Sequence, residues 1–301
     1  MSEMNFRVYD NVIIGKEVSI GDFAVIGMPL HGEKDGERET VIENGAVIGP
    51  HSLVFAGTML RHNFKCGHGA VIGANSVIGY DCSVGANSVI QHCRIGNSVV
   101  IGELVSLGIL PSKKYDYRGV GKDIEPIVAI GDNSVIRSHT SIYAQTKFGK
   151  DFNCGHGVRI RECTIVGNNT SIGTNTQIEG FCTIGDNVLL HTNVHIGQFS
   201  YLEDKTYIAP GTVLTNTPHP LCPAAKQCLQ GCVLKKGAKL STNVTVAPRV
   251  VIGENALVGA GAVVISDVAP NALVVGIPAR QVKDVREITC PYGLIDKPYK
   301  L

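Results

Sequence analysis

The later half of this 301-residue chain carries charged and polar side chains that recur every eighteen residues. One series contains Arg159, Gln177 and His195, and a second contains Arg161 and Glu179. If eighteen residues make one coil of a stacked chain, the members of a series lie about 4.8 Å apart on neighbouring coils. The spacing therefore predicts one polar side of the molecule, suited to hold a polar substrate.

A third series, which contains Glu162 and Asn216, borders this side, and His219 follows in a segment that leaves the repeat. Histidine titrates near neutral pH, so it is suited to remove a proton from an attacking amine or hydroxyl. Asn193 and Glu179 could position such a nucleophile. We expect His219 and Asn193 to be catalytic. The expected substrate-binding residues are His156, Arg159, Arg161, Glu162, Gln177, Glu179, His191, His195 and Asn216.

Structural roles compete with these assignments. Arg161 and Glu179 could form a cross-strand ion pair, worth roughly 0.2–1 kcal/mol if exposed. Asn193 stands in a turn position that the preceding coil also fills with asparagine, and such ladders are often structural. His156 matches His68 of a related, less charged segment, which favours a turn role.

The elements that must position these residues follow from a hydrophobic residue at every sixth position. Neither the 3.6-residue period of an α-helix nor the two-residue period of a strand explains this spacing. A triangular prism does, because each side takes a six-residue strand and turn and points one large aliphatic inward. The longest series is Ile130, Ile136, Ile142, Phe148, Cys154, Ile160, Val166, Ile172, Ile178, Ile184, Leu190, Ile196, Leu202, Ile208 and Leu214.

The remaining hexad positions agree with a prism. Small or β-branched residues recur four positions after the inward residue, where a corner would lie, and Gly, Asn and Asp crowd the turns. Similar series begin at Ile14, Ile42 and Leu234, with one five-residue step from Ile90 to Ile95. We therefore predict an all-β fold, a parallel β-helix of hexapeptide repeats with excursion loops.

Three segments leave the period and should loop out of the prism: residues 28–40, 103–128 and 216–233. Residues 278–286 could form a short helix with Pro278 near its start. We expect an N-terminal β-helix segment (1–102), a connecting loop (103–128), a catalytic β-helix segment (129–268, with the loop 216–233) and a C-terminal helix and tail (269–301).

The chain also contains an internal duplication. Residues 47–90 align without gaps onto residues 135–178, and the tetrapeptide at 66–69 is identical to that at 154–157. Charge differs between the copies, since Val71 and Gly73 correspond to Arg159 and Arg161, and the residue after Gly73 corresponds to Glu162. Charge added to one copy favours a functional site there over a purely structural scaffold.

Composition narrows the classes of partner. The net charge of +1 gives no reason to expect nucleic acid or an anionic membrane. We expect no signal peptide and no inserted segment, because no apolar run is long enough to span a bilayer. Ten scattered cysteines favour free thiols in the cytoplasm. Cys222, Cys228 and Cys232 could hold zinc, but their spacing matches no standard pair, so we expect no metal.

Several motifs carry a family resemblance. Hexads such as Ile130-Gly131-Asp132-Asn133-Ser134 resemble those of bacterial hexapeptide-repeat acyltransferases, which implies a left-handed parallel β-helix and a homotrimer. Residues 190–195 and 202–204 resemble nucleotide-amino-sugar N-acetyltransferases. Residues 217–221 are similar to the Thr-His-Pro loop of maltose and galactoside acetyltransferases, whose histidine is the general base. Residues 259–264 and 276–280 look like the coenzyme A end, which implies cofactor contacts at Ala260, Gly261, Pro278 and Arg280.

The resemblance implies a cytoplasmic N-acyltransferase that uses acetyl-CoA or another acyl-CoA. The acceptor would be the amino group of a nucleotide-linked amino sugar, bound between subunits. O-acetylation of a sugar hydroxyl stays open, with His219 as an essential base. A γ-type carbonic anhydrase also shares the fold. However, its Gly-His-x-x-x-x-His run is broken here by Gly73 after His68 and by Arg161 after His156.

Overall fold

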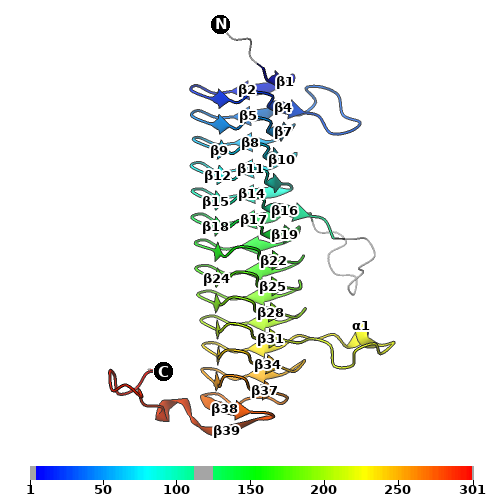
Figure 1. Cartoon of the computed structure of the whole chain (residues 1–301). Helices are drawn as coiled ribbons and strands as arrows, with labels where there is room; N and C mark the ends of the chain where they lie inside the picture. The colour runs from blue at the N-terminus through cyan, green and yellow to red at the C-terminus, as the bar shows by residue number, and fades with distance from the viewer. Residues whose placement is uncertain (1–4, 112–124, 300–301) are drawn as a thin grey trace. The chain divides into compact units, whose positions relative to one another are not determined.

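The computed structural model describes residues 5–111 and 125–299 (Figure 1). The chain divides into two compact units, residues 1–163 and 164–301, and each is described by itself. Half of the predicted connecting loop at 103–128, residues 112–124, lies outside the described residues. The predicted division at residues 102, 128 and 268 stays a prediction.

The first unit is built from short strands that pair in parallel with the strands one coil before and one coil after, and so form three sheets. Sheet A contains β1 (Arg7–Val8), β4 (Val25–Met28), β7 (Leu53–Phe55), β10 (Val71–Ile72), β13 (Val89–Ile90), β16 (Ser106–Ile109), β19 (Ser141–Tyr143) and β22 (Arg159–Ile160). Sheet B contains β2 (Val12–Ile14), β5 (Thr40–Ile42), β8 (Met59–Leu60), β11 (Val77–Ile78), β14 (Cys93–Ile95), β17 (Val128–Ile130) and β20 (Lys147–Phe148). Sheet C contains β3 (Ser19–Ile20), β6 (Val47–Ile48), β9 (Lys65–Cys66), β12 (Ser83–Val84), β15 (Val100–Ile101), β18 (Val135–Ile136) and β21 (Asn153–Cys154).

The second unit repeats this plan. Sheet D contains β23 (Ile165–Val166), β26 (Thr183–Ile184), β29 (Tyr201–Leu202), β32 (Val233–Leu234) and β35 (Val251–Ile252). Sheet E contains β24 (Ser171–Ile172), β27 (Leu189–Leu190), β30 (Tyr207–Ile208), β33 (Lys239–Leu240), β36 (Leu257–Val258), β38 (Ala272–Gly276) and β39 (Ala279–Asp284). Sheet F contains β25 (Gln177–Ile178), β28 (His195–Ile196), β31 (Val213–Leu214), β34 (Thr245–Val246) and β37 (Val263–Val264). The all-β parallel β-helix predicted from the sequence is confirmed, and it is consistent with the left-handed winding that the resemblance implies.

The predicted inward residues form the core. Every member of the series from Ile130 to Leu214 is buried, and so are the small residues at the corners. In the second unit the corner residue Thr176 donates from Oγ1 to the carbonyl oxygen of His191 (2.7 Å) and accepts from the amide of Val194 (3.2 Å). A buried hydroxyl is thus satisfied by backbone groups of the next coil, which explains why threonine suits a corner.

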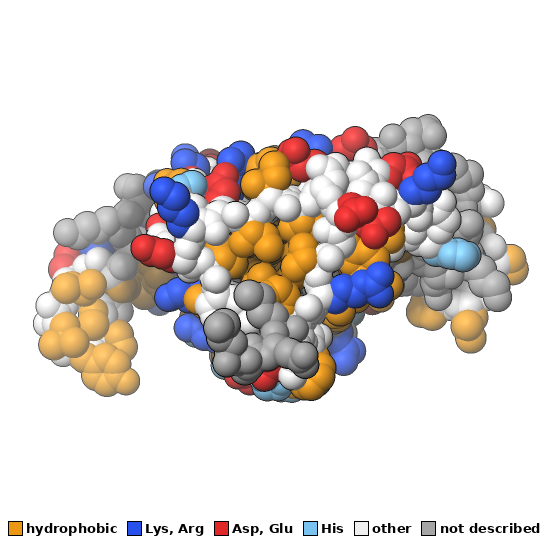
Figure 2. Space-filling model, turned by 90° about the horizontal axis from the view of Figure 1, so that it is seen from above, with side chains coloured by type: hydrophobic (Ala, Val, Ile, Leu, Met, Phe, Trp, Pro, Cys, Tyr) orange, Lys and Arg blue, Asp and Glu red, His pale blue; other side chains and the backbone are white. Residues whose placement is uncertain are grey.

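The first coil is less covered than those that follow. Ile14 is 39% exposed, whereas Ile26 and Ile42 are fully buried. Figure 2, seen from above, shows hydrophobic side chains gathered in the middle of this end with charged side chains around them. Ile14 on the first coil therefore lacks the cover that a preceding coil gives to Ile26 and Ile42.

Two excursions agree with the sequence: residues 29–39 follow β4, and residues 215–232 follow β31 and contain the short helix α1 (Ala225–Cys228). The third begins later than predicted, because β16 occupies residues 106–109. The reason is visible in the period, since Ile101 and Leu107 are six residues apart and both are buried. Of this loop, residues 112–124 lie outside the described part.

The C-terminal segment also differs from the prediction. Residues 279–284 form β39 rather than a helix, and only a 3-10 turn, η1 (Val285–Glu287), follows. β39 pairs antiparallel with β38 through Val275 and Arg280 and through Gly276 and Ala279. This pairing satisfies the backbone groups that β38 would otherwise present at a sheet edge, so the tail gains more as a strand than as an isolated helical turn. Within the described residues, no helix is long and apolar enough to cross a membrane.

Candidate functional site

The predicted site residues of the first unit centre on an ion pair beside β22. Arg161 donates to both carboxylate oxygens of Glu162, with Nε–Oε2 and Nη2–Oε1 distances of 2.8 Å. Its guanidinium also lies over the ring of Tyr143, 4.7 Å from the centroid. Glu162 is buried, and a buried carboxylate is stable only with such a partner. Glu162 therefore holds the Arg161 guanidinium in place, and the charge of Arg161 stays at the surface.

His156 and Arg159 lie on the same unit as this pair. Both side chains are exposed, His156 in a turn before β22 and Arg159 at the first position of that strand. Their exposure leaves them accessible to a ligand.

Sheet F of the second unit positions the next group. Gln177 of β25 and His195 of β28 are register partners, as the eighteen-residue spacing predicts. Glu179 follows β25, and its Oε1 lies 3.7 Å from Nε2 of His195. This is longer than a hydrogen bond, and both side chains are more than a third exposed, so the pair is loose and open to solvent.

His191 and Asn193 follow β27. The ring of His191 makes an edge contact with Tyr207, with centroids 5.4 Å apart. Asn193 is exposed and has φ of 56°, a left-handed conformation that asparagine adopts readily. Its conformation accounts for asparagine in this turn, and a contact with substrate stays a prediction.

Asn216 lies where the excursion leaves sheet F. An added Cβ at Gly197 would come within 3.1 Å of Asn216 Cβ, so Asn216 lies close to the end of β28 on the next coil. Asn216 accepts from the Thr217 hydroxyl at 3.0 Å, and its carbonyl oxygen accepts from the amide of Gln230, also at 3.0 Å. These contacts join the two ends of the excursion.

His219 lies near the beginning of the same excursion. Its side chain is exposed, and its carbonyl oxygen accepts from the amide of Cys222 at 3.2 Å. The backbone is therefore tied into a turn while the imidazole is open to solvent. The predicted single cleft that joins Arg161 to these second-unit residues stays a prediction.

The coenzyme A end predicted from the sequence lies at the last coils of the second unit. A side chain at Gly259 would meet Val275 Cγ1 at 2.7 Å, so glycine there allows β38 to pack closely. Gly261 has φ of 69° with no neighbouring atom within 4 Å of an added Cβ, and the adjacent Ala260 is exposed. Arg280 and Pro278 are also exposed. A ligand could approach the backbone at Gly261 closely, and the Arg280 guanidinium is suited to a phosphate.

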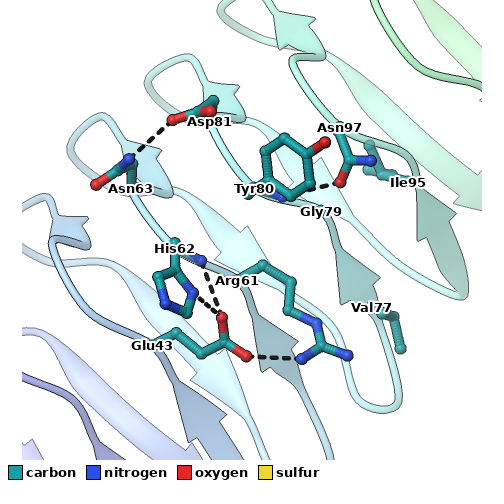
Figure 3. Close-up of a pocket in the computed structure, with 10 residues that line it drawn as sticks. All are labelled: Glu43, Arg61, His62, Asn63, Val77, Gly79, Tyr80, Asp81, Ile95 and Asn97. Atoms are coloured by element: carbon teal, nitrogen blue, oxygen red, sulfur yellow. Dashed lines mark hydrogen bonds and ion pairs between the residues drawn. The ribbon is translucent and has the colours of Figure 1, made fainter.

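A charged group on the first unit was not predicted from the sequence. Arg61 donates from Nη1 to Glu43 Oε1 at 2.7 Å, and the other oxygen of Glu43 contacts His62 Nδ1 and accepts from the His62 amide at 3.2 Å (Figure 3). Burial opposes the charge of Glu43, but the hydrogen bonds from Arg61 and His62 outweigh it, and its pKa is lowered. Glu43 and Arg61 are eighteen residues apart, so the spacing that relates Arg161 to Glu179 was a signal for this pair as well.

The cysteines are free. Burial raises the pKa of the Cys154 thiol to about 11 and those of Cys182 and Cys232 to about 12, so these side chains are protonated at neutral pH. Among residues 5–111 and 125–299, no group of three or more His, Cys, Asp or Glu side chains could hold a metal ion.

Residues 231–266 match the family model of the bacterial transferase hexapeptide, which spans six repeats. A Schizosaccharomyces pombe protein provisionally assigned as a serine acetyltransferase is 48% identical over 66 residues, which is 22% of this chain and 23% of that protein. The galactoside O-acetyltransferase of Escherichia coli is 27% identical over 88 residues, 28% of this chain and 43% of that enzyme. The chain thus spans less than half the length of either relative.

Solved structures match at low similarity. A perosamine N-acetyltransferase mutant from Caulobacter crescentus, in complex with CoA and GDP-perosamine, is 21% identical with a TM-score of 0.25. The match covers 48% of this chain and 57% of that one. The family model and the curated relatives confirm the predicted resemblance to hexapeptide-repeat acyltransferases. The chain is similar to the acyltransferases that carry this hexapeptide repeat.

Proposed function

We propose that this protein transfers an acetyl or other short acyl group from coenzyme A to the amino group of a nucleotide-linked amino sugar. The observation that carries the proposal lies in sheet F. Gln177 and His195 are aligned in register on β25 and β28, and the excursion bearing His219 leaves from β31 of the same sheet. The excursion therefore begins one coil after His195, and its solvent-exposed His219 would take the proton that the acceptor loses.

The reaction would proceed by direct attack. The acceptor nitrogen adds to the thioester carbonyl carbon, His219 takes the proton that the nitrogen loses, and the tetrahedral intermediate collapses as the C–S bond breaks and coenzyme A leaves as the thiol or thiolate. Asn193 would help to hold the acceptor. His156, Arg159, Arg161, Glu162, Gln177, Glu179, His191, His195 and Asn216 stay proposed as the residues that bind or position the nucleotide-linked sugar.

Acyl-CoA would bind at the last coils of the second unit. The open backbone at Gly261 and Ala260 would lie against the pantetheine chain, and Pro278 and Arg280 would contact the nucleotide end, with Arg280 on a phosphate. We also propose a cytoplasmic homotrimer with the site between neighbouring subunits. The free, protonated thiols support a reducing compartment.

O-acetylation of a sugar hydroxyl is the second candidate. It is favoured by the local similarity to the galactoside O-acetyltransferase and by the run Thr217-Pro218-His219-Pro220. A hydroxyl is a weaker nucleophile than a neutral amine, so loss of the base should reduce O-transfer more than N-transfer.

The test is thiol release from acetyl-CoA with a panel of UDP- and dTDP-linked amino sugars and with their hydroxyl analogues, for the wild type and His219→Ala. We expect release with an amino sugar and a decrease of about 10²-fold in the variant, which is typical of a lost general base. Release with hydroxyl acceptors alone would replace N-transfer with O-transfer. No release with any acceptor would refute both.

A further inference from the structure

The group around Glu43 lines a surface cavity of about 720 Å³ on the first unit, and neither the family resemblance nor the proposed acyl transfer uses it. The cavity lies along sheet B, where the turns after β5, β8, β11 and β14 stack on one another (Figure 3). Four successive coils therefore contribute to one hollow, which is long enough for a ligand of several rings or a chain.

One part of the cavity wall is an ion-paired group. Glu43 is only 19% exposed and is contacted by both Arg61 and His62. Its lowered pKa keeps it ionised at neutral pH, so its charge cancels that of Arg61. His62 uses Nδ1 on Glu43, and its Nε2 has no partner among the described residues, so this atom is available to a ligand.

The other part offers an aromatic face beside polar groups. Tyr80 is half exposed, and its amide donates to Asn97 Oδ1 at 3.2 Å. Asn63 donates to Asp81 Oδ1 at 2.9 Å, which leaves the second oxygen of Asp81 as an acceptor. Val77 adds an apolar contact within the same cavity.

The duplicated segment shows that this group is not a requirement of the coil. The duplication relates residues that are 88 positions apart. With this offset Glu43 corresponds to Gly131 and Arg61 to Gly149. Likewise, His62 corresponds to Lys150 and Tyr80 to Asn168. The β-helix continues through these positions without the charged trio or the aromatic ring. Side chains that the fold does not need, gathered around a cavity, indicate a ligand.

We propose that this cavity binds an uncharged saccharide. The paired charges of Glu43 and Arg61 and the additional carboxylate of Asp81 leave no excess positive charge, which disfavours a phosphorylated ligand. A pyranose has an apolar face and hydroxyl edges. Its face would pack on the ring of Tyr80 and the methyl groups of Val77, while its hydroxyls donate to Asp81 and exchange hydrogen bonds with His62 Nε2. The proposal does not depend on acyl transfer.

The test uses methyl glycosides of glucose, galactose, mannose and N-acetylglucosamine, measured by saturation-transfer NMR and calorimetry on the full chain. We expect at least one glycoside to bind, Tyr80→Ala to weaken it by at least about tenfold, and Asp81→Asn to weaken it with the fold retained. Lys150→Ala, at the position that corresponds to His62, is the matched control and should bind as the wild type does. Thiol release should be unchanged in Tyr80→Ala, which separates this site from the proposed acyl transfer.

The proposal is overturned if none of the glycosides binds the wild type, or if both Tyr80→Ala and Asp81→Asn bind as tightly as the wild type. It is also overturned if inorganic phosphate or UMP, rather than a glycoside, binds in a manner that Tyr80→Ala abolishes.

Discussion

The two copies of the duplicated segment share their inward residues and differ at the surface. Phe64 and its counterpart Phe152 are both fully buried, and the following thiols, Cys66 and Cys154, are buried as well. The charged side chains stand at different places. The earlier coils carry Glu43, Arg61 and His62, and the later copy carries Arg159, Arg161 and Glu162.

This difference indicates that the inward residues determine the coil, whereas the outward residues can change to ones that bind a ligand. Each coil of a repeat protein contacts only its neighbours, so an outward change disturbs little beyond its own coil. The two charged groups are therefore interpreted as two independent sites on one scaffold, a saccharide cavity in the early coils and an acyl-transfer site in the later ones.

The largest expected effect tests the shared core. Phe64→Ala and Phe152→Ala each remove a fully buried ring, and we expect each to lower the free energy of unfolding by about 3–5 kcal/mol. Chemical denaturation followed by circular dichroism measures both. The two copies do not share an equivalent core if one variant is strongly destabilised and the other loses less than about 1 kcal/mol.

A smaller effect tests the ion pair of the later copy. Glu162→Ala installs the residue that the earlier copy has at this position, Ala74, and leaves Arg161 without its bidentate partner. We expect a loss of about 2 kcal/mol in the free energy of unfolding, because a partly buried charge loses its hydrogen bonds. The double variant Arg161→Gly with Glu162→Ala restores the earlier copy's pair of residues and should lose less than the single variant. An equal or larger loss in the double variant would show that the pair is not coupled.

The smallest effect concerns the pH dependence at Glu43. Its pKa is below the ordinary value of 4.5 in the folded state, so its contribution to stability is fully present above pH 4.5 and is lost as the pH falls through the lower, folded-state value. Arg61 and His62 are about half exposed, which limits the contribution to roughly 0.2–1 kcal/mol. Unfolding curves of the wild type and Glu43→Gln should differ at pH 7 and converge near pH 3. A difference that stays constant with pH would assign the effect to packing instead of charge.

Much of the fold could be predicted because the inward position repeats every six residues and a charged residue cannot be buried there. The strand β16 was not predicted because the five-residue step from Ile90 to Ile95 shifts the positions of the inward residues. After this step the six-residue spacing resumes and includes Leu107, which is buried in β16. The hairpin of β38 and β39 could not be read from local propensity, because it depends on a sheet edge that only the completed coils provide.

The site was less predictable than the fold. The eighteen-residue spacing correctly predicted that Gln177 lies beside His195, because the parallel strands β25 and β28 pair in that register. It could not place His219, because the excursion 215–232 leaves the period and its path depends on contacts such as Asn216 with Gln230. The same eighteen-residue spacing relates Glu43 to Arg61, but no function was predicted for the early coils.

The most direct test of two independent sites is to measure both activities in both variants. We predict that His219→Ala reduces thiol release from acetyl-CoA by about 10²-fold and binds the methyl glycoside as the wild type does. Tyr80→Ala should weaken glycoside binding by at least about tenfold and leave thiol release unchanged. Loss of both properties in either variant, with the fold intact, would contradict the account.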